Sequence, residues 1–575
     1  MNTKKSLEEF ISDIKRCLES EDYENAKKIL IDALEFFPNQ PSLLINLGNI
    51  YKCFGDYEEA ENYYKKVLEI EISKEAYNNL SVTCLEKNSI EESIVFAKKA
   101  IEVDVNYIDA YYNLSLAYEK SGDYENAKAT LRKILTIHDD YPHALILLYR
   151  VFQNTCDWEN MESIENKLDE MIEMGIEHPF MNVSRSENSE MNYTVAKSWA
   201  EKNVMAISKQ PIKKITKKNK KIKLGYICGE FRDHPTFHLI KNLFREHDTK
   251  NFEIYIFSFN HDEETKIKLQ KNIFKFFDIT KNSDSESIEI INNCNLDILI
   301  DLSVVISNNR INILKSKPAK KIISYLGYPG TSGCQHYDFL LTDSVVTPKD
   351  HQPFYIEKFL FLPDCYQIND GKSNFSKSTE TRSQHQLPEN SIVLASFNQS
   401  FKLDSVMFNC WLEILKELND SVLWLLEDNE IAMKNLYRYV EKNNIDKQRL
   451  IFAKRVGRDL HLERIKLANV ILDTRIYNGH TTTIDALQSG IPVVTKTGNH
   501  FASRVSTSLL LSLGLDELCC DNLKDYKQKI IDLCMNKKIK SQILKKLTDK
   551  KNYEKVHDNK FFAKKLEKIL IERVL

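Results

Sequence analysis

The sequence predicts an α superhelix of paired helices followed by two Rossmann-like α/β lobes. Three observations predict this fold class. A short motif recurs every 33 or 34 residues up to Glu159, apolar runs alternate with helix-like stretches from Lys221 onward, and this alternation starts afresh at Ile392. Repeats of this length are typical of stacked helical hairpins. Strands that alternate with helices are typical of βαβ units and a parallel sheet.

The repeat is clearest in the motif Asp-Tyr-Glu-Asn-Ala, which begins at Asp22. It returns with offsets of 34, 33 and 34 residues, and Asp157-Trp158-Glu159 follows another 34 residues on. The copies are Asp56–Ala60, Ser89–Ser93 and Asp123–Ala127. Asp or Ser at these positions can cap the second helix of each pair by accepting hydrogen bonds from its free amides.

A second register places small residues where the two helices of a pair must approach closely. Gly48, Ser81 and Ser115 recur in the first helix, and their small partners in the second are Ala60, Ser93 and Ala127. Larger side chains would fill the space between the helices: Tyr51, Tyr64, Tyr118 and Leu131. This spacing resembles the tetratricopeptide repeat.

One such repeat cannot bury its own apolar face, so stacked copies form a superhelix with a concave groove. We expect the groove to bind a protein acceptor. Self-association is the alternative, and the sequence leaves open a homodimer formed through the repeats.

Composition limits the classes of protein to consider. A net charge of -3 argues against a nucleic-acid binder, and 42% apolar with 28% charged residues is typical of a globular chain. The 12 cysteines show no Cys-x-x-Cys spacing, which favours a reduced protein over a disulfide framework. Met1–Leu18 lacks the apolar segment of a signal peptide, and no apolar run approaches membrane-spanning length. We therefore expect a cytoplasmic protein that does not associate with membranes.

Domain limits follow from these changes of pattern. We expect repeats over 1–175, a linker helix and a basic linker over 176–221, an N-terminal lobe over 222–385 and a C-terminal lobe over 386–575. Tyr193, Ala196 and Trp199 indicate the linker helix. The lysines after it fit a solvated linker better than a nuclear-targeting or nucleic-acid segment; they are Lys213, Lys214, Lys217, Lys218, Lys220 and Lys221.

Apolar runs mark the expected strands of both lobes. The first lobe has Lys223–Cys228, Phe252–Phe257 and Leu296–Val305, with helix-like stretches over His238–Glu246 and Ser285–Asn292. The runs of the second lobe are Ile392–Phe397, Val422–Leu426, Leu450–Phe452, Val470–Leu472 and Val493–Thr495. Ligands of open parallel sheets bind outside the carboxyl ends of the strands, so we expect a cleft between the two lobes.

In the second lobe, Asn478–Asp485 follows a strand and opens a helix. Its amides, its threonine hydroxyls and the helix dipole suit a pyrophosphate, and Asp485 can accept bonds from ribose hydroxyls. Lys402 follows another strand and is a natural partner of the departing diphosphate. Arg458 and His461 enter the helix before the Ile471 strand, where they can reach a base or ribose. Taken singly, each feature also fits an ordinary capped helix or loop.

In the first lobe, His234 follows a strand and can point into the cleft as a base or a sugar contact. The segment Gly327-Tyr328-Pro329-Gly330-Thr331-Ser332-Gly333 has three glycines, which let backbone amides approach a sugar closely. A structural histidine and an ordinary tight turn are the alternatives.

Together with Ala502–Val505, these segments and their order resemble the catalytic region of O-GlcNAc transferases, the family shared by nucleocytoplasmic and bacterial enzymes, and the chain looks like a bacterial-type member. The resemblance covers nearly the whole chain. It implies a GT-B fold and inverting transfer of GlcNAc from UDP-GlcNAc to Ser or Thr hydroxyls of proteins. It also implies that no metal or other cofactor takes part.

The resemblance further implies roles for single residues. Lys402 and the amides of His480, Thr481 and Thr482 would hold the diphosphate. Four residues would contact the nucleoside: Gln399, Arg458, His461 and Asp485. His234 and the Gly327-Tyr328-Pro329 loop would face the sugar and the acceptor, with His234 and Lys402 as the catalytic residues.

Two features depart from the family pattern. Val304-Val305-Ile306 stands where relatives commonly place a small residue, His or Tyr, and Thr, and Tyr477 is larger than the cysteine of some relatives. Three apolar side chains remove partners for a sugar, at about 1–3 kcal/mol for each polar group left unmet. The exact donor, GDP-fucose included, therefore stays open. The other alternative is a non-catalytic repeat scaffold with a degenerate transferase region. The acceptor protein and the catalytic base are also left open.

Overall fold

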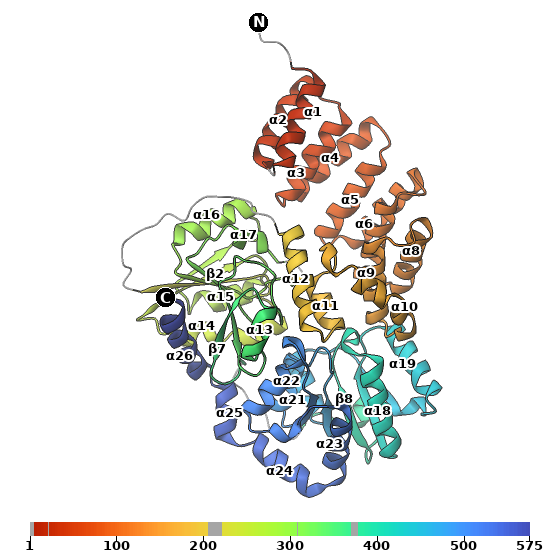
Figure 1. The fold of residues 1–575 in the computed structure, drawn as a ribbon, viewed down its shortest axis with the longest axis vertical. Coiled ribbons are helices and arrows are strands. Elements are labelled where there is room, and N and C mark those ends of the chain that lie inside the picture. Colours follow the sequence, from red (N-terminus) through yellow and green to blue (C-terminus); the bar gives the residue numbers. More distant parts are fainter. Residues whose placement is uncertain (1–4, 21, 205–220, 307–308, 370–377) are drawn as a thin grey trace. The chain divides into compact units, whose positions relative to one another are not determined.

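The computed structural model describes residues 5–20, 22–204, 221–306, 309–369 and 378–575. The chain divides into two compact units, Met1–Val151 and Phe152–Leu575. Figure 1 shows the first unit as helices alone and the second as helices around parallel sheets.

The first unit consists of helices joined in pairs by short turns. Its helices are α1 (Leu7–Glu19), α2 (Tyr23–Phe36), α3 (Pro41–Cys53), α4 (Tyr57–Ile70), α5 (Lys74–Glu86), α6 (Ile90–Val103), α7 (Ile108–Ser121) and α8 (Tyr124–Ile137). Helix α9 (Pro142–Asn154) then carries the chain into the second unit. The predicted helical superhelix is confirmed.

Three of the predicted helix caps are confirmed. The carboxylates of Asp22, Asp56 and Asp123 each accept a bond of 3.2 Å from the amide three residues on. Ser89 was expected to do the same, and this prediction is wrong, because its side chain makes no capping bond. The same prediction is wrong for Asp157, which makes no capping bond and instead accepts from the side chain of Asn160 at 2.8 Å. The backbone angles at Ser89 and Asp157 are close to those at Asp22, so they do not explain the missing bonds.

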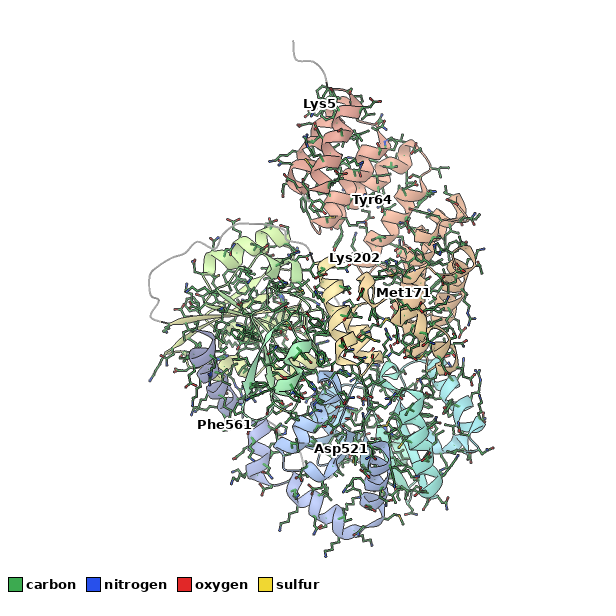
Figure 2. All side chains as sticks on the ribbon, in the orientation of Figure 1. Lys5, Tyr64, Met171, Lys202, Asp521 and Phe561 are labelled. Atoms are coloured by element: carbon green, nitrogen blue, oxygen red, sulfur yellow. The ribbon has the colours of Figure 1, made fainter. Side chains whose placement is uncertain are left out.

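The small residues of the repeats are needed for close helix packing. A Cβ at Gly48 would lie 2.6 Å from the ring of Tyr64, which is fully buried and donates a 2.7 Å bond to Asn49. Figure 2 labels Tyr64 inside this unit. Ser81 and Ser93 meet at 2.9 Å between their hydroxyls. The small residues that recur in the sequence thus lie at contacts between paired helices.

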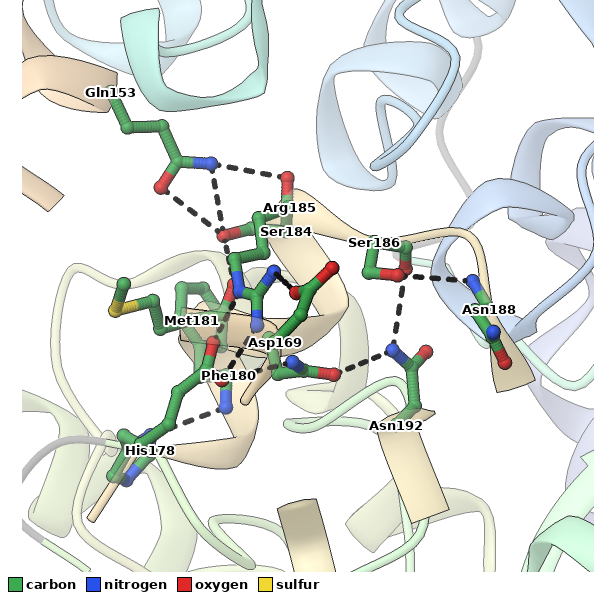
Figure 3. Close-up of polar contacts among 12 residues, drawn as sticks. Gln153, Asp169, His178, Phe180, Met181, Ser184, Arg185, Ser186, Asn188 and Asn192 are labelled. Carbon is green, nitrogen blue, oxygen red and sulfur yellow. Dashed lines mark hydrogen bonds and ion pairs between the residues drawn. The ribbon is translucent and has the colours of Figure 1, made fainter. Parts of the chain in front are cut away.

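The second unit begins with helices that are tied together by a buried polar network. They are α10 (Trp158–Asp169), α11 (Pro179–Arg185) and α12 (Ser189–Asn203). The guanidinium of Arg185 pairs with Glu177 and Asp169, each at 2.7 Å, and Gln153 donates to the carbonyl of Ser184 at 3.1 Å. Figure 3 shows the Arg185–Asp169 pair and the Gln153–Ser184 bond. The linker helix predicted from Trp199 is α12.

Most of the basic linker, Lys213–Lys220, lies outside the described residues. Of the lysines named for it, Lys221 is described, and it is exposed.

The N-terminal lobe contains a seven-stranded parallel sheet in the order β3-β2-β1-β4-β5-β6-β7. Its strands are β1 (Ile222–Cys228), β2 (Phe252–Ser258), β3 (Lys275–Asp278), β4 (Ile298–Asp301), β5 (Lys321–Ser324), β6 (Phe339–Asp343) and β7 (Lys358–Leu362). The helices between them are α13 (Pro235–Ile240), α14 (Leu243–Glu246), α15 (Glu263–Gln270), α16 (Asp284–Cys294) and α17 (Ile311–Lys315). The order places β1 beside β4, where the direction of winding reverses.

The C-terminal lobe repeats this topology in a six-stranded parallel sheet, β10-β9-β8-β11-β12-β13. Its strands are β8 (Ile392–Ser396), β9 (Ser421–Leu426), β10 (Leu450–Ala453), β11 (Val470–Leu472), β12 (Val493–Lys496) and β13 (Cys519–Cys520). The helices are α18 (Ser405–Glu417), α19 (Glu430–Lys442), α20 (Arg458–Ile465), α21 (Thr481–Gln488), α22 (Val505–Ser512), α23 (Leu523–Met535), α24 (Lys537–Leu547), α25 (Lys550–His557) and α26 (Asn559–Ile569). The winding reverses between β8 and β11.

Two expected elements differ from the structure. The run Leu296–Val305 was expected as one strand, but β4 stops at Asp301, whose carboxylate binds the amides of Ser303 and Val304 and turns the chain. His238–Glu246 was expected as one helix, but the chain forms α13 and α14. Pro235 starts α13 early, with His234 as its cap.

Helix α26 connects the two lobes of the second unit. Helix α26 returns to the N-terminal lobe, where Glu567 accepts from the amide of Asp248 at 2.8 Å and meets Nδ1 of His247 at 2.9 Å. Over the residues that the structure describes, no helix combines the length and the apolar character needed to cross a membrane.

Candidate active site

Most of the predicted site residues follow strands at the two points where the strand orders reverse, whereas Arg458 and His461 follow the edge strand β10. In the N-terminal lobe, His234 follows β1, Val304 follows β4, and Gly327 follows the neighbouring β5. In the C-terminal lobe, the Lys402 loop follows β8 and the His480 loop follows β11. Such switch points are where open parallel sheets bind ligands.

Lys402 joins the two loops of the C-terminal lobe. Its ammonium donates a 2.9 Å bond to the carbonyl of Asn478 and lies 4.3 Å from the ring centroid of Tyr477. Burial lowers the pKa of Lys402 to about 8, against a smaller opposing effect of the Asp473 carboxylate. The structure thus holds a partly desolvated cation beside the start of α21, an arrangement suited to a diphosphate.

Asp473 orders the loop that leads to α21. This buried carboxylate accepts from the amide of Gly479 and from the hydroxyl of Thr495, each at 2.6 Å. Sequence reasoning did not assign it a role. The signal that points to it is an acidic residue directly after the apolar strand Val470–Leu472.

The start of α21 is tightly packed around Gly479. A Cβ there would lie 2.5 Å from the Thr482 hydroxyl and 2.7 Å from that of Thr483, so only glycine fits without movement. Thr482 donates at 2.8 Å to Asn398, which in turn donates at 3.1 Å to Thr474. Asn398 therefore connects the loops after β8 and β11, and it was not assigned a role from the sequence.

His480 is the residue before this helix, and its ring is neutral and makes no capping bond. Burial lowers its pKa well below the usual value, and Nε2 lies 3.2 Å from the carbonyl of Ala502. A neutral ring beside a carbonyl carries its proton on that nitrogen. The ring stacks on Tyr477 with centroids 4.8 Å apart. Thr481, the first residue of α21, is partly exposed.

Three of the four residues expected to contact the nucleoside lie near one another: Arg458, His461 and Asp485. Arg458, the first residue of α20, pairs with Asp485 at 2.7 Å, and Asp485 lies in the second turn of α21. Nδ1 of His461 accepts from Arg464 at 3.1 Å, and burial lowers the pKa of His461 to about 3. Gln399 is exposed in the β8 loop.

Arg464 and Phe397 support this group and were not predicted to act in it. The Arg464 guanidinium lies 5.2 Å from the centroid of the Phe397 ring, and the His461 ring meets Phe397 edge-on at 5.1 Å. Their signal in the sequence is weak, because an arginine within a helix is usually solvated.

In the N-terminal lobe, His234 is oriented as a hydrogen-bond donor. Its Nδ1 accepts from the amide of Thr236 at 3.3 Å, and Nε2 lies 3.9 Å from the buried carboxylate of Glu230. Burial lowers the pKa of His234 to about 4. A neutral ring with an accepting Nδ1 carries its proton on Nε2.

The loop that holds Tyr328 and Pro329 approaches the β4 loop closely. A Cβ on Gly327 would overlap the carbonyl oxygen of Leu302. Leu326 has a φ of +70°, and the amide of Gly327 donates to the carbonyl of Tyr325 at 2.9 Å. This γ-turn is strained for a leucine. Strain of this kind clusters at functional sites.

Glu357 anchors the other end of this loop. Its fully buried carboxylate accepts from the Thr331 hydroxyl and the Ser332 amide, each at 2.7 Å, and also from the Ser332 hydroxyl. Tyr328 and Pro329 between these anchors are buried.

Val304 and Val305 pack inside the protein beside this loop. Both are buried and belong to one apolar cluster with Tyr328 and Tyr477. Val304 has a φ of +53°, which a β-branched residue rarely adopts.

Contacts between the lobes hold the two groups of residues in place. Ser508 of α22 donates to Asp343 at the end of β6 at 2.7 Å, and Arg504 donates to the carbonyl of Val345 at 2.7 Å. After burial, the charge of Arg458 is the next largest effect that lowers the pKa of His238. The N-terminal and C-terminal residues therefore face the same region.

Helix α11 packs against the loops that follow β8 and β11. The ring of Phe180 lies 5.8 Å from that of Tyr477 and 5.9 Å from that of Phe401. The adjacent Glu187 carboxylate bridges Arg475 at 3.1 Å and Lys496 at 2.9 Å. The linker helices therefore belong to the same packed unit as both lobes.

Comparison with known proteins bears on both parts of the chain. A family model described as Glycosyl transferase family 41 matches residues 156–381 and 377–566. Tetratricopeptide repeat models match residues 43–75, 74–106 and 108–140.

Two curated relatives and one solved structure illustrate the similarity. The chain is 33% identical over 357 residues to the "Probable UDP-N-acetylglucosamine--peptide N-acetylglucosaminyltransferase SEC" of Arabidopsis thaliana, covering 61% of this chain and 36% of that one. It is 24% identical to the "UDP-N-acetylglucosamine--peptide N-acetylglucosaminyltransferase" of Caenorhabditis elegans, covering 53% and 36%. An O-GlcNAc transferase structure from Thermobaculum terrenum aligns with a TM-score of 0.66 at 21% identity, covering 92% and 96%.

The solved structure confirms the predicted fold, repeats followed by a two-lobed GT-B region. The chain spans about a third of the length of the curated relatives it matches. Because the family model matches most of the chain, including all the predicted site residues, the chain belongs to glycosyl transferase family 41.

Proposed function

We propose that this protein is an inverting O-glycosyltransferase that moves GlcNAc from UDP-GlcNAc to Ser or Thr hydroxyls of protein acceptors. The observation that carries the proposal is the half-buried Lys402 ammonium beside the amides at the start of α21, at the switch point of the second sheet. Membership of family 41 and the names of the relatives support the same reaction.

The proposed chemistry is a single displacement at the anomeric carbon, in which the acceptor oxygen bonds to that carbon as its bond to the diphosphate breaks. Lys402 and the amides of His480, Thr481 and Thr482 stabilise the charge that develops on the leaving diphosphate. One preorganised donor of this kind contributes about 2.7–4 kcal/mol to transition-state stabilisation. Arg458, His461, Asp485 and Gln399 hold the nucleoside in this proposal.

The acceptor hydroxyl must lose a proton in this reaction. His234 was considered as the base, but its accepting Nδ1 is already bonded to Thr236 and its Nε2 carries the proton. We therefore assign His234 a donor contact to the sugar or the diphosphate. The proton acceptor is then a phosphate oxygen or a water relay.

We further propose that transfer needs no metal. Within the described residues no group of three or more His, Cys, Asp or Glu is arranged to hold one. Charge stabilisation by Lys402 and the α21 amides supplies what a metal would otherwise supply.

The partners are part of the proposal. The repeats bind the acceptor protein along their groove, copies of the chain can pair through the repeats, and the protein acts in the cytoplasm. The repeat matches and the relatives named as peptide transferases support a protein acceptor.

Isothermal titration with UDP, GDP and UDP-GlcNAc tests the donor, followed by UDP-GlcNAc hydrolysis with and without a cell lysate. We expect micromolar binding of UDP and UDP-GlcNAc, weaker binding of GDP, and sugar turnover. Preferential binding of GDP would point to a GDP-sugar such as GDP-fucose.

A non-catalytic scaffold is the second candidate function. The observation that favours it is the apolar Val304 and Val305 pair beside Tyr328, which offers a sugar no side-chain hydrogen bonds. Nucleotide binding without turnover of any UDP-sugar would support the scaffold. Absence of nucleotide binding would remove the diphosphate assignment altogether.

A further inference from the structure

The fifth copy of the repeated motif, Asp157–Met161, has a tryptophan at its second position. Its second residue is Trp158, where the other copies have Tyr23, Tyr57, Ile90 and Tyr124. Trp158 is the first residue of α10, and it lies inside the segment that the family 41 model matches. An indole brings an N–H group that neither tyrosine nor isoleucine has.

That N–H group reaches the loop that carries Lys402. Nε1 of Trp158 donates to the carbonyl of Leu403 at 3.2 Å, and the thiol of Cys156 donates to the carbonyl of Ser400 at 3.8 Å. Both side chains are buried, at 8% and 4% exposure. The two bonds hold backbone carbonyls on either side of Lys402.

The turn before α10 is itself fixed to the C-terminal lobe. Asn429 donates to the carbonyl of Asn154 and Asn435 to that of Thr155, each at 2.9 Å. On the lobe side, the amide of Ser400 donates to Asp428 at 2.9 Å. The Lys402 loop is thus held from its own lobe and from the end of the repeat region.

Ring packing fixes the direction of the indole N–H. Trp158 lies 5.3 Å from the ring of Phe408 and meets Tyr439 edge-on at 4.9 Å. A phenylalanine at this position would keep most of these contacts and lose the hydrogen bond. Packing and hydrogen bonding can therefore be separated by one substitution.

We propose that Trp158, assisted by Cys156, is a positioning residue for Lys402: it fixes the backbone of residues 400–403 so that the ammonium stays beside the start of α21. This inference rests on the proposed role of Lys402 in holding the diphosphate. By this inference, the turn before α10 contributes to the donor site.

The test compares UDP with uridine, which lacks the phosphates. In the full-length Trp158→Phe variant, we expect UDP affinity to fall about three- to tenfold, the effect of losing one hydrogen bond. Uridine affinity should stay within twofold of the parent. In a Lys402→Ala background, the same substitution should change UDP affinity less than twofold.

Cys156→Ala provides a milder second variant, with Cys410→Ala as its matched control. Cys410 is also buried and donates to a carbonyl, that of Leu523, at 3.7 Å, but this bond does not involve the Lys402 loop. We expect the ratio of UDP to uridine affinity to fall with Cys156→Ala and to be unchanged with Cys410→Ala. If Trp158→Phe does not fold, the comparison of Cys156→Ala with Cys410→Ala tests the positioning role.

Equal losses for UDP and uridine, or an undiminished effect in the Lys402→Ala background, would overturn the positioning role. Failure of the parent protein to bind UDP would instead reject the diphosphate site, and the positioning proposal with it. The two failures are distinguished by the titration of the parent protein alone.

Discussion

At the scale of single residues, the site depends on groups whose protonation, hydration or backbone conformation is set by their surroundings. Lys402 is desolvated beside an aromatic ring, and His234 and His461 are kept neutral by burial. Val304 and Leu326 have positive φ values. Such states persist because the surrounding hydrogen bonds and packing determine them, and they favour a preorganised site.

Lys402 gives the first prediction. Lys402→Ala should lower kcat about 100- to 1000-fold while the fold remains intact, because one charge-stabilising donor is lost. Turnover of UDP-GlcNAc and circular dichroism check the two halves of the prediction. Full activity in this variant would contradict the diphosphate assignment.

The pKa of Lys402 predicts a pH dependence. Since the pKa is lowered to about 8, the ammonium predominates below pH 8 and is lost above it. We expect kcat/KM to fall as pH rises through about 8, because this ratio reports the free enzyme. Lys402→Arg should remove that decline, because arginine stays protonated throughout this range. A decline of the same midpoint in both proteins would assign it to another group.

The backbone angle at Val304 predicts that a glycine variant at this position is more stable than an alanine variant, which reverses the usual order. Alanine usually stabilises a chain relative to glycine, but at a φ of +53° an L side chain is strained by about 1–2 kcal/mol. We expect Val304→Gly to unfold in urea with a free energy about 1 kcal/mol higher than that of Val304→Ala. The ordinary order, with the alanine variant more stable, would mean that the backbone relaxes.

At the scale of elements, loops at the carboxyl ends of strands carry the site, and short helices begin within those loops. His234 caps α13, and the Asn478–His480 segment leads into α21. The helix starts place backbone amides where the strand order reverses, and the two arrangements together favour an anion.

Gly479 tests the α21 element. In Gly479→Ala, the new methyl group would lie 2.5 Å from the Thr482 hydroxyl, so the turn must shift, at a cost of about 1–3 kcal/mol. We expect UDP affinity to fall at least tenfold, and we expect only a small decrease in the melting temperature. Gly457→Ala is a matched control, since a Cβ there meets nothing within 4 Å. Unchanged UDP binding in Gly479→Ala would show that the turn adapts.

At the scale of the second unit, the two lobes, α10–α12 and α26 pack as one body. Asp343 is central to it, because its carboxylate accepts from the amides of Val345, Val346 and Tyr366 as well as from Ser508 of the other lobe. We infer that the relative position of the lobes is fixed by buried polar contacts in addition to apolar packing.

Asp343 predicts how strongly the lobes are coupled. In Asp343→Asn, an amide group would face donors that now bind a carboxylate, so we expect a loss of about 3 kcal/mol of unfolding free energy. Ser508→Ala removes one of these donors and should cost about 1 kcal/mol. Denaturant unfolding measures both. Equal effects of the two substitutions would mean that the bond between the lobes dominates.

Much of this organisation was predictable from the sequence, because it depends on periodicity. The 34-residue register predicted paired helices and their caps at Asp22, Asp56 and Asp123, and apolar runs predicted eight strands that the structure contains. Five strands escaped prediction: β3, β5, β6, β7 and the two-residue β13. Strands this short or partly exposed lack a long continuous apolar run.

Local patterns in the sequence were enough to predict the repeat superhelix, the two parallel sheets and the polar loops after their strands. Which distant groups meet became visible only in the folded protein. Trp158 reaches Leu403, Arg458 pairs with Asp485, and Asp473 orders the α21 loop. The protonation state of His234 and the desolvation of Lys402 also depend on the folded structure. They arise from burial and from contacts between segments far apart in the chain. Neither burial nor such contacts can be read from a local pattern in the sequence.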